Sequence, residues 1–596
     1  MRRLGDPIKA METYRQAQAL FARGRHRDGE IGAWRNIGIA YALDLNDDQR
    51  ALDAFDAALK LSHASSNQRG EIQARLYRGE TLRRMGRLAD ASGELHAALD
   101  GATRIGLVEE QWKALYSLGR LVHAEGRGDA ARRSYEQAIV TIESVRADLQ
   151  TAALKSEFLA DKRDVYDALI ALRIADASAS AADVFALVEQ SRARTWQDRL
   201  QPGAERLSLA DVQPKIAEGT LLLEYWSGPG GLALLWISSS ASGIVTLPAS
   251  AAGVASLNQF AAAVSRVDGD WRSASVAAGR VLLAGLPDHI VSKGVTRLIV
   301  VADGPLHFVP FEALTIPGGR DLLVERFEVT YLPSAALLVR RSAPPHRAWK
   351  WPWQRILLAF GDPAGTSAAS SDEDAATPRL SHAEEEIHGI VDTLPGRADV
   401  HVGIDAQKKF LSQEPAHAPL LHFSTHAIAD TRDPDRSRVL LAPAAAGGPA
   451  DYLFLREIYD LDLAGVQLVT LSACDTERGK VIRGEGVEGF SRALLAAGVA
   501  SAVTTMWDVV DRAGAEFMKQ FYFGLAHGES EASALREAKL QFLRSPLAWS
   551  HPRYWAGYVL NGDGAARLPR VIPWSAIVAA PLLTALVLAA LSRRGT

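Results

Sequence analysis

Cysteine is almost absent from this chain of 596 residues, which contains one, Cys474. A framework of intrachain disulfides is therefore excluded, and so is a zinc site built on several cysteines. No other cluster of potential ligands is visible, so we expect no metal and no cofactor. Charge of one sign is not in excess either, because 66 Lys and Arg stand against 70 Asp and Glu. Binding through a globally basic surface has no support, and no nucleic-acid partner is expected.

The composition is otherwise that of a globular protein, with 48% hydrophobic and 23% charged residues. At roughly 100–200 residues per domain, the length predicts about three or four domains. The first residues contain no apolar core of about 7–15 residues, so a secretory signal is not expected. We therefore expect the bulk of the chain in the cytoplasm.

One long hydrophobic run stands near the carboxyl end, where residues 571–591 include no charged residue. A helix over these residues would span roughly 32 Å, close to the hydrocarbon thickness of a bilayer. Arginines flank the run on both sides, at Arg567, Arg570, Arg593 and Arg594. Trp574 suits the membrane interface, whereas Pro573 and Pro581 favour the alternative of a buried core helix. We expect a single-pass carboxyl-terminal anchor in the inner (cytoplasmic) membrane, with the preceding domains on the cytoplasmic side.

The first 150 residues are self-similar at an interval of 40 or 41 residues. The recurring positions are Phe55, Leu95 and Tyr135, then Ala58, Ala98 and Ala138, and finally Gly38, Gly79 and Gly119. Small residues at fixed places let two helices approach closely, and large ones fill the space between pairs. The pattern resembles tetratricopeptide repeats with longer helices, which stack into a curved solenoid that mostly holds peptides or proteins. We expect a protein or peptide activator to bind here; a scaffold that only packs on the rest of the chain is the alternative.

After Pro202 the pattern changes to that of an α/β protein. Residues 220–226 and 231–237 are separated by a Ser-Gly-Pro-Gly turn and predict a β-hairpin. Short apolar runs then alternate with helical stretches, at 298–302, 356–360, 399–403, 420–424, 466–472 and 500–506. Such runs predict a mainly parallel sheet covered by helices on both faces. The polar, acidic segment 363–379 suits a solvated loop, with a processing site as the alternative.

The sequence thus predicts a multidomain chain, in which an all-α repeat solenoid precedes an α/β domain and one transmembrane helix. The expected parts are the repeats (1–150), a helical connector (151–204), two parts of the α/β domain (205–345 and 346–562), a linker (563–570) and the membrane helix (571–591). The second part of the α/β domain carries the residues with catalytic potential.

Two reactive residue types follow neighbouring runs of the predicted sheet. His426 comes after the run 420–424, and Cys474 comes after the run 466–472. Catalytic groups collect beyond the carboxyl ends of strands in open parallel sheets. A free thiol with a pKa of about 8.5 is mostly protonated at neutral pH, but an adjacent imidazole raises its thiolate fraction. The backbone N–H groups of Ala427 and Cys474 are candidates for an oxyanion hole.

A structural role for each of these two residues is the alternative. A lone cysteine is commonly a small buried hydrophobic residue, and a lone histidine is commonly a satisfied core or surface group. Catalysis is favoured here because both residues follow strands that are expected to be neighbours.

Five motifs carry a resemblance to a known family. They are DGPLHFVPFEAL (303–314), ILLAFGDP (356–363), HFSTHA (422–427), LSACDT (471–476) and GEGVEGFSRALLAAGVASAVTTMWDVVD (484–511). Together they resemble the CHAT peptidases, caspase-like domains associated with tetratricopeptide repeats, over roughly residues 205–562. The resemblance implies a cysteine endopeptidase of the clan of caspases, separase and gingipains, with a role in defence or programmed cell death. In it His426 would be the general base and acid and Cys474 the nucleophile, at a spacing close to that of caspases.

The substrate pocket is marked less clearly. Its candidate residues are Asp430, Asp475, Glu485, Trp507 and Asp508. A loop contact is an equal alternative for Glu485, and strand-end packing is an alternative for Trp507 and Asp508. Metacaspases, which accept basic P1 residues, carry an aspartate two positions before the cysteine, where this chain has Ser472. Their preference for a basic P1 residue therefore cannot be carried over.

These observations predict a membrane-tethered cysteine endopeptidase that cleaves a protein substrate and is regulated by a partner on the repeats. The alternative from another class is a non-catalytic, membrane-anchored scaffold that uses the repeats alone. An acyl hydrolase or transferase is a weaker hypothesis, because nothing suggests a thioester or lipid pocket. The substitution Cys474→Ala separates the first two, because a scaffold would keep its activity.

Overall fold

The computed structural model divides into two compact units, Met1–Ser178 and Ala179–Thr596. It describes residues 6–147, 149, 162–192, 207–248, 251–267, 269–286, 294–340, 349–363, 379–413, 418–431, 433–445, 451–473, 476–477, 479–482 and 486–577. Within these ranges the first unit contains helices and no strands, whereas the second combines helices with an extended sheet.

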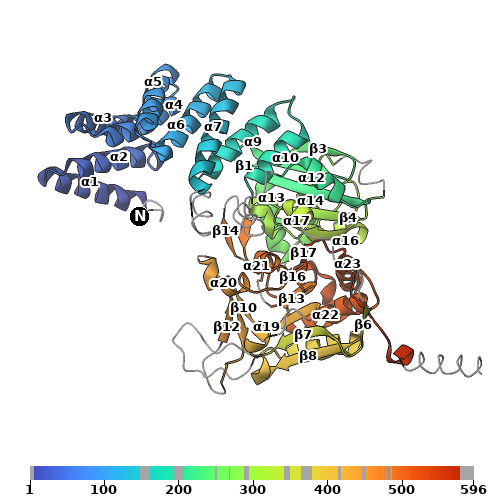
Figure 1. Ribbon diagram of the computed structural model, residues 1–596. Coiled ribbons are helices and arrows are strands. Elements are labelled where there is room, and N and C mark those ends of the chain that lie inside the picture. The colour runs from blue at the N-terminus through green and yellow to red at the C-terminus, as the bar shows by residue number, and fades with distance from the viewer. Residues whose placement is uncertain are drawn as a thin grey trace, which may run out of the picture. The chain divides into compact units, whose positions relative to one another are not determined.

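The first unit is a row of helices (Figure 1), in which short turns join consecutive helices from α1 to α7. Its helices are α1 (Pro7–Arg23), α2 (Arg27–Leu43), α3 (Asp48–Ala64), α4 (Gln68–Arg84), α5 (Leu88–Arg104), α6 (Val108–Ala124), α7 (Gly128–Ala147) and α9 (Arg163–Ala175). The Asp47 and Asn67 side chains cap α3 and α4, accepting hydrogen bonds from first-turn N–H groups at 3.1 and 2.7 Å. Gly86 and Gly126 take φ values of 76° and 77° just beyond α4 and α6, a conformation that favours glycine.

The repeat interval has a direct cause in packing. A Cβ atom added to Gly38 would lie 2.4 Å from the ring of Phe55, and one added to Gly119 would lie 2.4 Å from the ring of Tyr135. The middle pair of helices repeats the contact with a leucine in place of the aromatic ring. A large residue of one helix thus covers a glycine of its partner at each interval. The predicted helical repeats are confirmed.

The connector predicted at 151–204 is divided between the two units. α9 packs against α7 in the first unit, whereas α10 (Ala181–Gln190) belongs to the second. The buried carboxylate of Glu189 on α10 accepts hydrogen bonds from the Ser334 hydroxyl at 2.6 Å and from the Ala335 N–H at 3.2 Å. These bonds make α10 an integral part of the α/β unit.

The second unit is built on an eleven-stranded sheet in the order β3-β2-β1-β4-β5-β17-β16-β13-β9-β7-β8. The strands are β1 (Thr220–Gly228), β2 (Gly231–Ile237), β3 (Ser242–Leu247), β4 (Arg297–Val301), β5 (Glu328–Tyr331), β7 (Arg355–Gly361), β8 (Arg397–Val402), β9 (Leu420–Ser424), β13 (Leu468–Ser472), β16 (Ser501–Thr505) and β17 (Tyr558–Gly562). β1 and β2 form the predicted hairpin.

Most neighbouring strands in this sheet are parallel, as predicted. One parallel block joins β1, β4, β5 and β17, and a second joins β16, β13, β9, β7 and β8. The two blocks run in opposite directions, because β16 and β17 pair antiparallel. β17 returns to the sheet after two helices and inserts between strands that are distant in sequence.

Helices and short strands surround the sheet. The helices are α12 (Leu209–Val212), α13 (Ala251–Val264), α14 (Trp271–Leu282), α16 (Leu323–Arg326), α17 (Ala336–Arg340), α18 (Ala383–Thr393), α19 (Lys409–Gln413), α20 (Leu455–Ile458), α21 (Phe490–Ala496), α22 (Asp511–Ala526) and α23 (Glu531–Leu543). The short strands are β6 (Trp349–Lys350), β10 (Ala427–Ile428), β11 (Arg438–Leu441), β12 (Asp451–Phe454), β14 (Lys480–Ile482), β15 (Gly486–Glu488) and β18 (Arg570–Val571). Short 3₁₀ turns include η3 (Gly304–Phe308), η4 (Phe311–Ala313) and η9 (Pro552–Tyr554).

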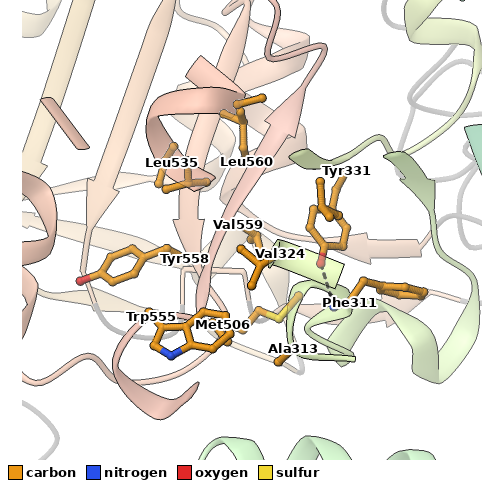
Figure 2. Close-up of a cluster of buried hydrophobic side chains, with 14 of the residues drawn as sticks. Phe311, Ala313, Val324, Tyr331, Met506, Leu535, Trp555, Tyr558, Val559 and Leu560 are labelled. Atoms are coloured by element: carbon orange, nitrogen blue, oxygen red, sulfur yellow. Dashed lines mark hydrogen bonds between the residues drawn. The ribbon is translucent and has the colours of Figure 1, made fainter. Parts of the chain in front are cut away.

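The two parts of the α/β domain predicted at 205–345 and 346–562 share one core. Figure 2 shows its centre, where side chains of η4 and β5 meet those that follow β16 and those of β17. The Tyr331 hydroxyl accepts a hydrogen bond from the Phe311 N–H at 3.0 Å and donates one to Glu312 at 2.5 Å. The other carboxylate oxygen of Glu312 accepts a bond from Lys539 on α23 at 2.6 Å. Both charged side chains are about 2% exposed, so the motif at 303–314 joins the two parts through a buried ion pair.

The predicted membrane helix falls mostly outside the described residues. Val571, its expected first residue, belongs to the strand β18 instead, because Arg570 and Val571 pair with Trp349 and Lys350 of β6. Residues 574–577 are helical, and 578–596 lie beyond the described part, as does most of the predicted loop 363–379. Among the helices described, none combines the length and the apolar character that crossing a bilayer requires.

Candidate active site

The proposed catalytic residues follow two strands that lie side by side in register. β9 and β13 are parallel neighbours, and Ser424 is the register partner of Ser472 at their carboxyl ends. The prediction that these two runs are adjacent is thus confirmed. His426 lies two residues beyond Ser424, and Cys474 follows Ser472 by two residues. Cys474 itself lies outside the described residues, together with the pocket candidates Asp475 and Glu485.

The backbone around His426 is fixed by contacts with β11. The His426 carbonyl accepts a hydrogen bond from the Leu440 N–H at 2.8 Å. One residue earlier, the buried Thr425 hydroxyl donates to the Leu440 carbonyl at 2.9 Å. The imidazole itself is half-buried, and the backbone that carries it is held by β11.

The candidate oxyanion group at Ala427 lies at the start of β10. Ala427 is the register partner of Val439 in the antiparallel pair β10–β11. Because the Leu440 N–H donates to His426, Ala427 and Val439 form a non-hydrogen-bonded pair. The N–H of Ala427 consequently points away from β11.

Both flanks of residues 474–475 are tied to the end of β16. On one flank, the Thr505 hydroxyl donates to the carbonyl of Ala473 at 2.5 Å. On the other, the Thr505 N–H donates to the Thr476 hydroxyl at 2.7 Å, and the Glu477 N–H donates to the Thr505 carbonyl at 2.8 Å. Thr476 and Thr505 are fully buried. This arrangement, which we call the threonine clamp, fixes the two ends of the segment that contains Cys474.

Glu477 is a residue of this region that sequence reasoning missed. Its carboxylate accepts hydrogen bonds from Ser491 at 3.1 Å, from Thr504 at 2.5 Å and from Asn561 at 3.2 Å. Burial raises the pKa of Glu477 to about 7, although the three hydrogen bonds oppose the shift. The only signal in the sequence was its place directly after the LSACDT motif.

A small cavity of about 30 Å³ lies beside Glu477, which is room enough for water. Its polar lining also includes His307 of η3, Arg492 of α21 and Asn561 of β17. Burial lowers the pKa of His307 to about 4, opposed by Asp303, so its imidazole is neutral at neutral pH. The described residues include no group of three or more His, Cys, Asp or Glu that could hold a metal ion.

The described pocket candidates lie at two places near this edge of the sheet. Trp507 and Asp508 follow β16, which neighbours β13 on the side opposite to β9. Trp507 is buried, and its indole N–H donates to the Arg553 carbonyl at 2.9 Å, which is the strand-end packing considered above. Asp508 is exposed. Asp430 follows β10, where its carboxylate accepts a bond from the Asp433 N–H at 2.9 Å and so stabilises its own loop.

Comparison with known proteins agrees with the resemblance seen in the sequence. The model of the family described as "CHAT domain" matches residues 273–563. Tetratricopeptide repeat protein 28 of Mus musculus is 27% identical over 315 residues, and that of Homo sapiens is 28% identical over 310 residues. Each alignment covers 45% of this chain and 12% of the relative, so the chain spans only a small part of these relatives.

Two kinds of solved structure align with the chain at low identity. The separase–securin complex of Saccharomyces cerevisiae aligns over 92% of this chain and 48% of that chain, at 10% identity and a TM-score of 0.49. The complex of the pro- and mature domains of RgpB from Porphyromonas gingivalis covers 52% of this chain and 76% of that chain, at 10% identity and a TM-score of 0.32.

Proposed function

We propose that this chain, which carries a CHAT domain at residues 273–563 after tetratricopeptide-like repeats, is a cysteine endopeptidase. The observation that carries the proposal is the register of Ser424 and Ser472, because it directs the chain toward His426 and Cys474 from the same edge of the sheet. The single cysteine of the chain, Cys474, lies in the LSACDT motif, where the resemblance to the CHAT peptidases implies the nucleophile.

The proposed reaction divides peptide hydrolysis into two steps. His426 accepts the thiol proton of Cys474, and the sulfur attacks the carbonyl carbon of the scissile bond. The N–H groups of Ala427 and Cys474 donate to the oxyanion. His426 then protonates the leaving amine, which departs and leaves a thioester on Cys474. Water deprotonated by His426 hydrolyses the thioester and restores the thiol.

The threonine clamp supports this assignment by positioning the nucleophile. Its hydrogen bonds end on Ala473 and on Thr476, the residues that flank 474–475. A nucleophile must be held within a fraction of an ångström for efficient attack, and buried hydrogen bonds on both flanks suit that need. Thr505 therefore acts through the loop and not on the substrate, as a positioning residue.

The substrate pocket is proposed at the same edge, from Asp430, Asp475, Glu485, Trp507 and Asp508. Among them, Asp508 combines an exposed side chain with a place directly beyond the strand next to β13. A carboxylate there would favour a basic P1 side chain.

Regulation and location complete the proposal. A protein or peptide partner bound to the repeats would control cleavage, since helical repeats of this kind mostly hold proteins. The part of the uncharged run that follows β18, from Trp574 to Leu591, would anchor the chain in the inner membrane, with the CHAT domain on the cytoplasmic side.

The test of the proposed activity is a map of new protein amino termini. The full chain and its Cys474→Ala variant are each incubated with lysate of the host cell, and new termini are identified by mass spectrometry. We expect termini that appear with the unmodified chain alone and share one P1 residue. Identical termini with both proteins, while the proposed partner is present, would favour the non-catalytic scaffold.

A further inference from the structure

Four tryptophans form an exposed cluster next to the carboxyl-terminal segment. Trp349, Trp351, Trp353 and Trp574, which we call the tryptophan patch, are 61%, 44%, 52% and 61% exposed. The rings of Trp351 and Trp353 are stacked with centroids 5.0 Å apart, and the ring of Trp574 lies 5.9 Å from that of Trp353. Two segments more than 200 residues apart in sequence thus bring their indoles to one place.

Backbone hydrogen bonds between β6 and β18 fix the positions of the segments that carry the tryptophan patch. β6 and β18 pair in parallel, and the Ile572 N–H donates to the Lys350 carbonyl at 2.9 Å. A turn holds the next residues, since the Trp351 N–H donates to the Gln354 side chain at 2.8 Å and the Gln354 N–H donates to the Trp351 carbonyl at 2.9 Å. Figure 1 shows β6 beside the last described residues of the chain. The tryptophans are therefore presented outward by ordered structure.

Exposure of this kind is unusual for tryptophan and unlike the rest of the unit. Trp226, Trp507 and Trp555 of this unit are almost completely buried. The patch exposes an aromatic area on the order of 500 Å², which in a soluble protein commonly marks an interaction surface. Because an indole has an apolar body and a polar N–H, clustered tryptophans suit the interface between water and lipid better than either phase alone.

The surroundings of the patch indicate a lipid partner. The uncharged run of the sequence continues directly from Trp574, which itself belongs to the patch. One cation lies beside the patch, Arg570 on β18, whose guanidinium is 5.7 Å from the centre of the Trp349 ring. Arg567 stands three residues earlier. Cations beside interfacial indoles favour anionic headgroups.

We propose that the tryptophan patch is a membrane-interface surface, which seats the CHAT domain against a bilayer that contains anionic lipid. The proposal rests on the membrane tether of the proposed function for its orientation, and it goes further, because it assigns lipid contact to the folded domain itself. The patch and the tether together would hold the active-site edge at a fixed orientation to the membrane. Peptidase activity is not required for this contact.

The single cysteine allows a direct test. In the full chain carrying Cys474→Ala, Trp353→Cys provides one thiol in the patch, and Val276→Cys on α14 provides a control thiol at a partly exposed position elsewhere in the same unit. Each variant is labelled with an environment-sensitive fluorophore and added to vesicles of phosphatidylcholine and phosphatidylglycerol. Lipids with a nitroxide near the headgroup then report how close each label lies to the interface.

We expect quenching of most of the fluorescence at position 353 and none at position 276. Replacing Trp351 and Trp574 by serine in the Trp353→Cys protein should reduce the quenching, and vesicles of phosphatidylcholine alone should reduce it too. If the protein floats with the vesicles but the label at 353 is not quenched, the proposed lipid contact of the tryptophan patch is wrong. The membrane tether would then remain supported, and a protein partner for the patch would be favoured. No flotation at all would overturn both. The peptidase proposal is tested independently by the map of termini.

Discussion

Ser424 at the end of β9 and Ser472 at the end of β13 are register partners in a parallel strand pair. His426 and Cys474 each follow their serine by two residues. β9 and β13 therefore end at the same edge of the sheet, where parallel α/β proteins collect their catalytic groups. Neither residue alone would identify a site, and the register is what relates them.

The threonine clamp predicts a loss of catalysis from a nearly isosteric change. Thr505→Val removes the hydroxyl that donates to the Ala473 carbonyl and leaves that carbonyl buried without this donor. We expect kcat to fall by roughly 10- to 100-fold, equivalent to about 1–3 kcal/mol, with KM nearly unchanged. The assay is cleavage of a peptide taken from the mapped termini. Thr246→Val on the edge strand β3, where the threonine is exposed, is the matched control. An unchanged kcat in folded Thr505→Val protein would contradict the positioning role.

Glu477 predicts a specific dependence of stability on pH. Burial raises the pKa of its carboxyl from 4.5 to about 7 in the folded protein, so the folded state holds the proton more tightly than the unfolded state. The corresponding stability is fully present below about pH 4.5 and is lost as the pH rises through about 7, by up to about 3 kcal/mol. Glu477→Gln should flatten this part of the profile, measured as the free energy of unfolding in urea at several pH values. The same slope in both proteins would argue against a raised pKa.

The buried pair of Glu312 and Lys539 predicts a strong coupling. Each side chain is about 2% exposed, and burial lowers the pKa of Lys539 while Glu312 raises it. Lys539→Met leaves a buried carboxylate without its cation, so we expect the free energy of unfolding to fall by about 3–5 kcal/mol. Adding Glu312→Leu should recover part of the loss, because the uncompensated charge is then gone. Additive effects of the two substitutions in denaturant titrations would show that the pair is not coupled.

The repeats offer a matched pair of glycine substitutions. Gly119→Ala places a Cβ atom 2.4 Å from the ring of Tyr135, so the helices must move apart, at a cost of about 1–3 kcal/mol. Gly93 lies within α5, and a Cβ atom there meets nothing within 4 Å. Gly93→Ala should therefore stabilise the repeats by about 0.5–1 kcal/mol. Thermal unfolding of the full chain measures both, and a neutral Gly119→Ala would refute the packing account of the repeat interval.

Much of the fold could be predicted from the sequence where local pattern and burial agree. The run 420–424 coincides with β9, because a central strand buried on both faces is a continuous apolar stretch. The repeat interval was also visible, since each glycine and its large neighbour recur along the chain. The predicted start of the membrane helix at Val571 was wrong, because Val571 pairs with Lys350 in the strand β18. The residues next to Val571 in the sequence do not predict this strand.

The parts that escaped prediction depend on contacts between distant segments. β17 joins the sheet antiparallel to β16 after two intervening helices. The local sequence of β17 does not predict the direction in which this strand runs. The hydrogen bond from Asn561 to Glu477 joins residues 84 positions apart. The tryptophan patch likewise requires β6 and β18 to meet. Composition and spacing marked the candidate residues, whereas the hydrogen-bond partners that hold the residues flanking them come from other parts of the chain.

The most direct test of the account is the rate at which Cys474 is alkylated by iodoacetamide as a function of pH. Because the chain contains one cysteine, all modification reports on that thiol. We predict an apparent pKa clearly below the value of about 8.5 for a free thiol, and a return toward about 8.5 in His426→Ala. The control His96→Ala changes an exposed histidine on α5, in the repeat unit, and should leave the profile unchanged. A thiol that titrates near 8.5 in the unmodified chain, or a profile that His426→Ala does not shift, would contradict the proposed nucleophile and base.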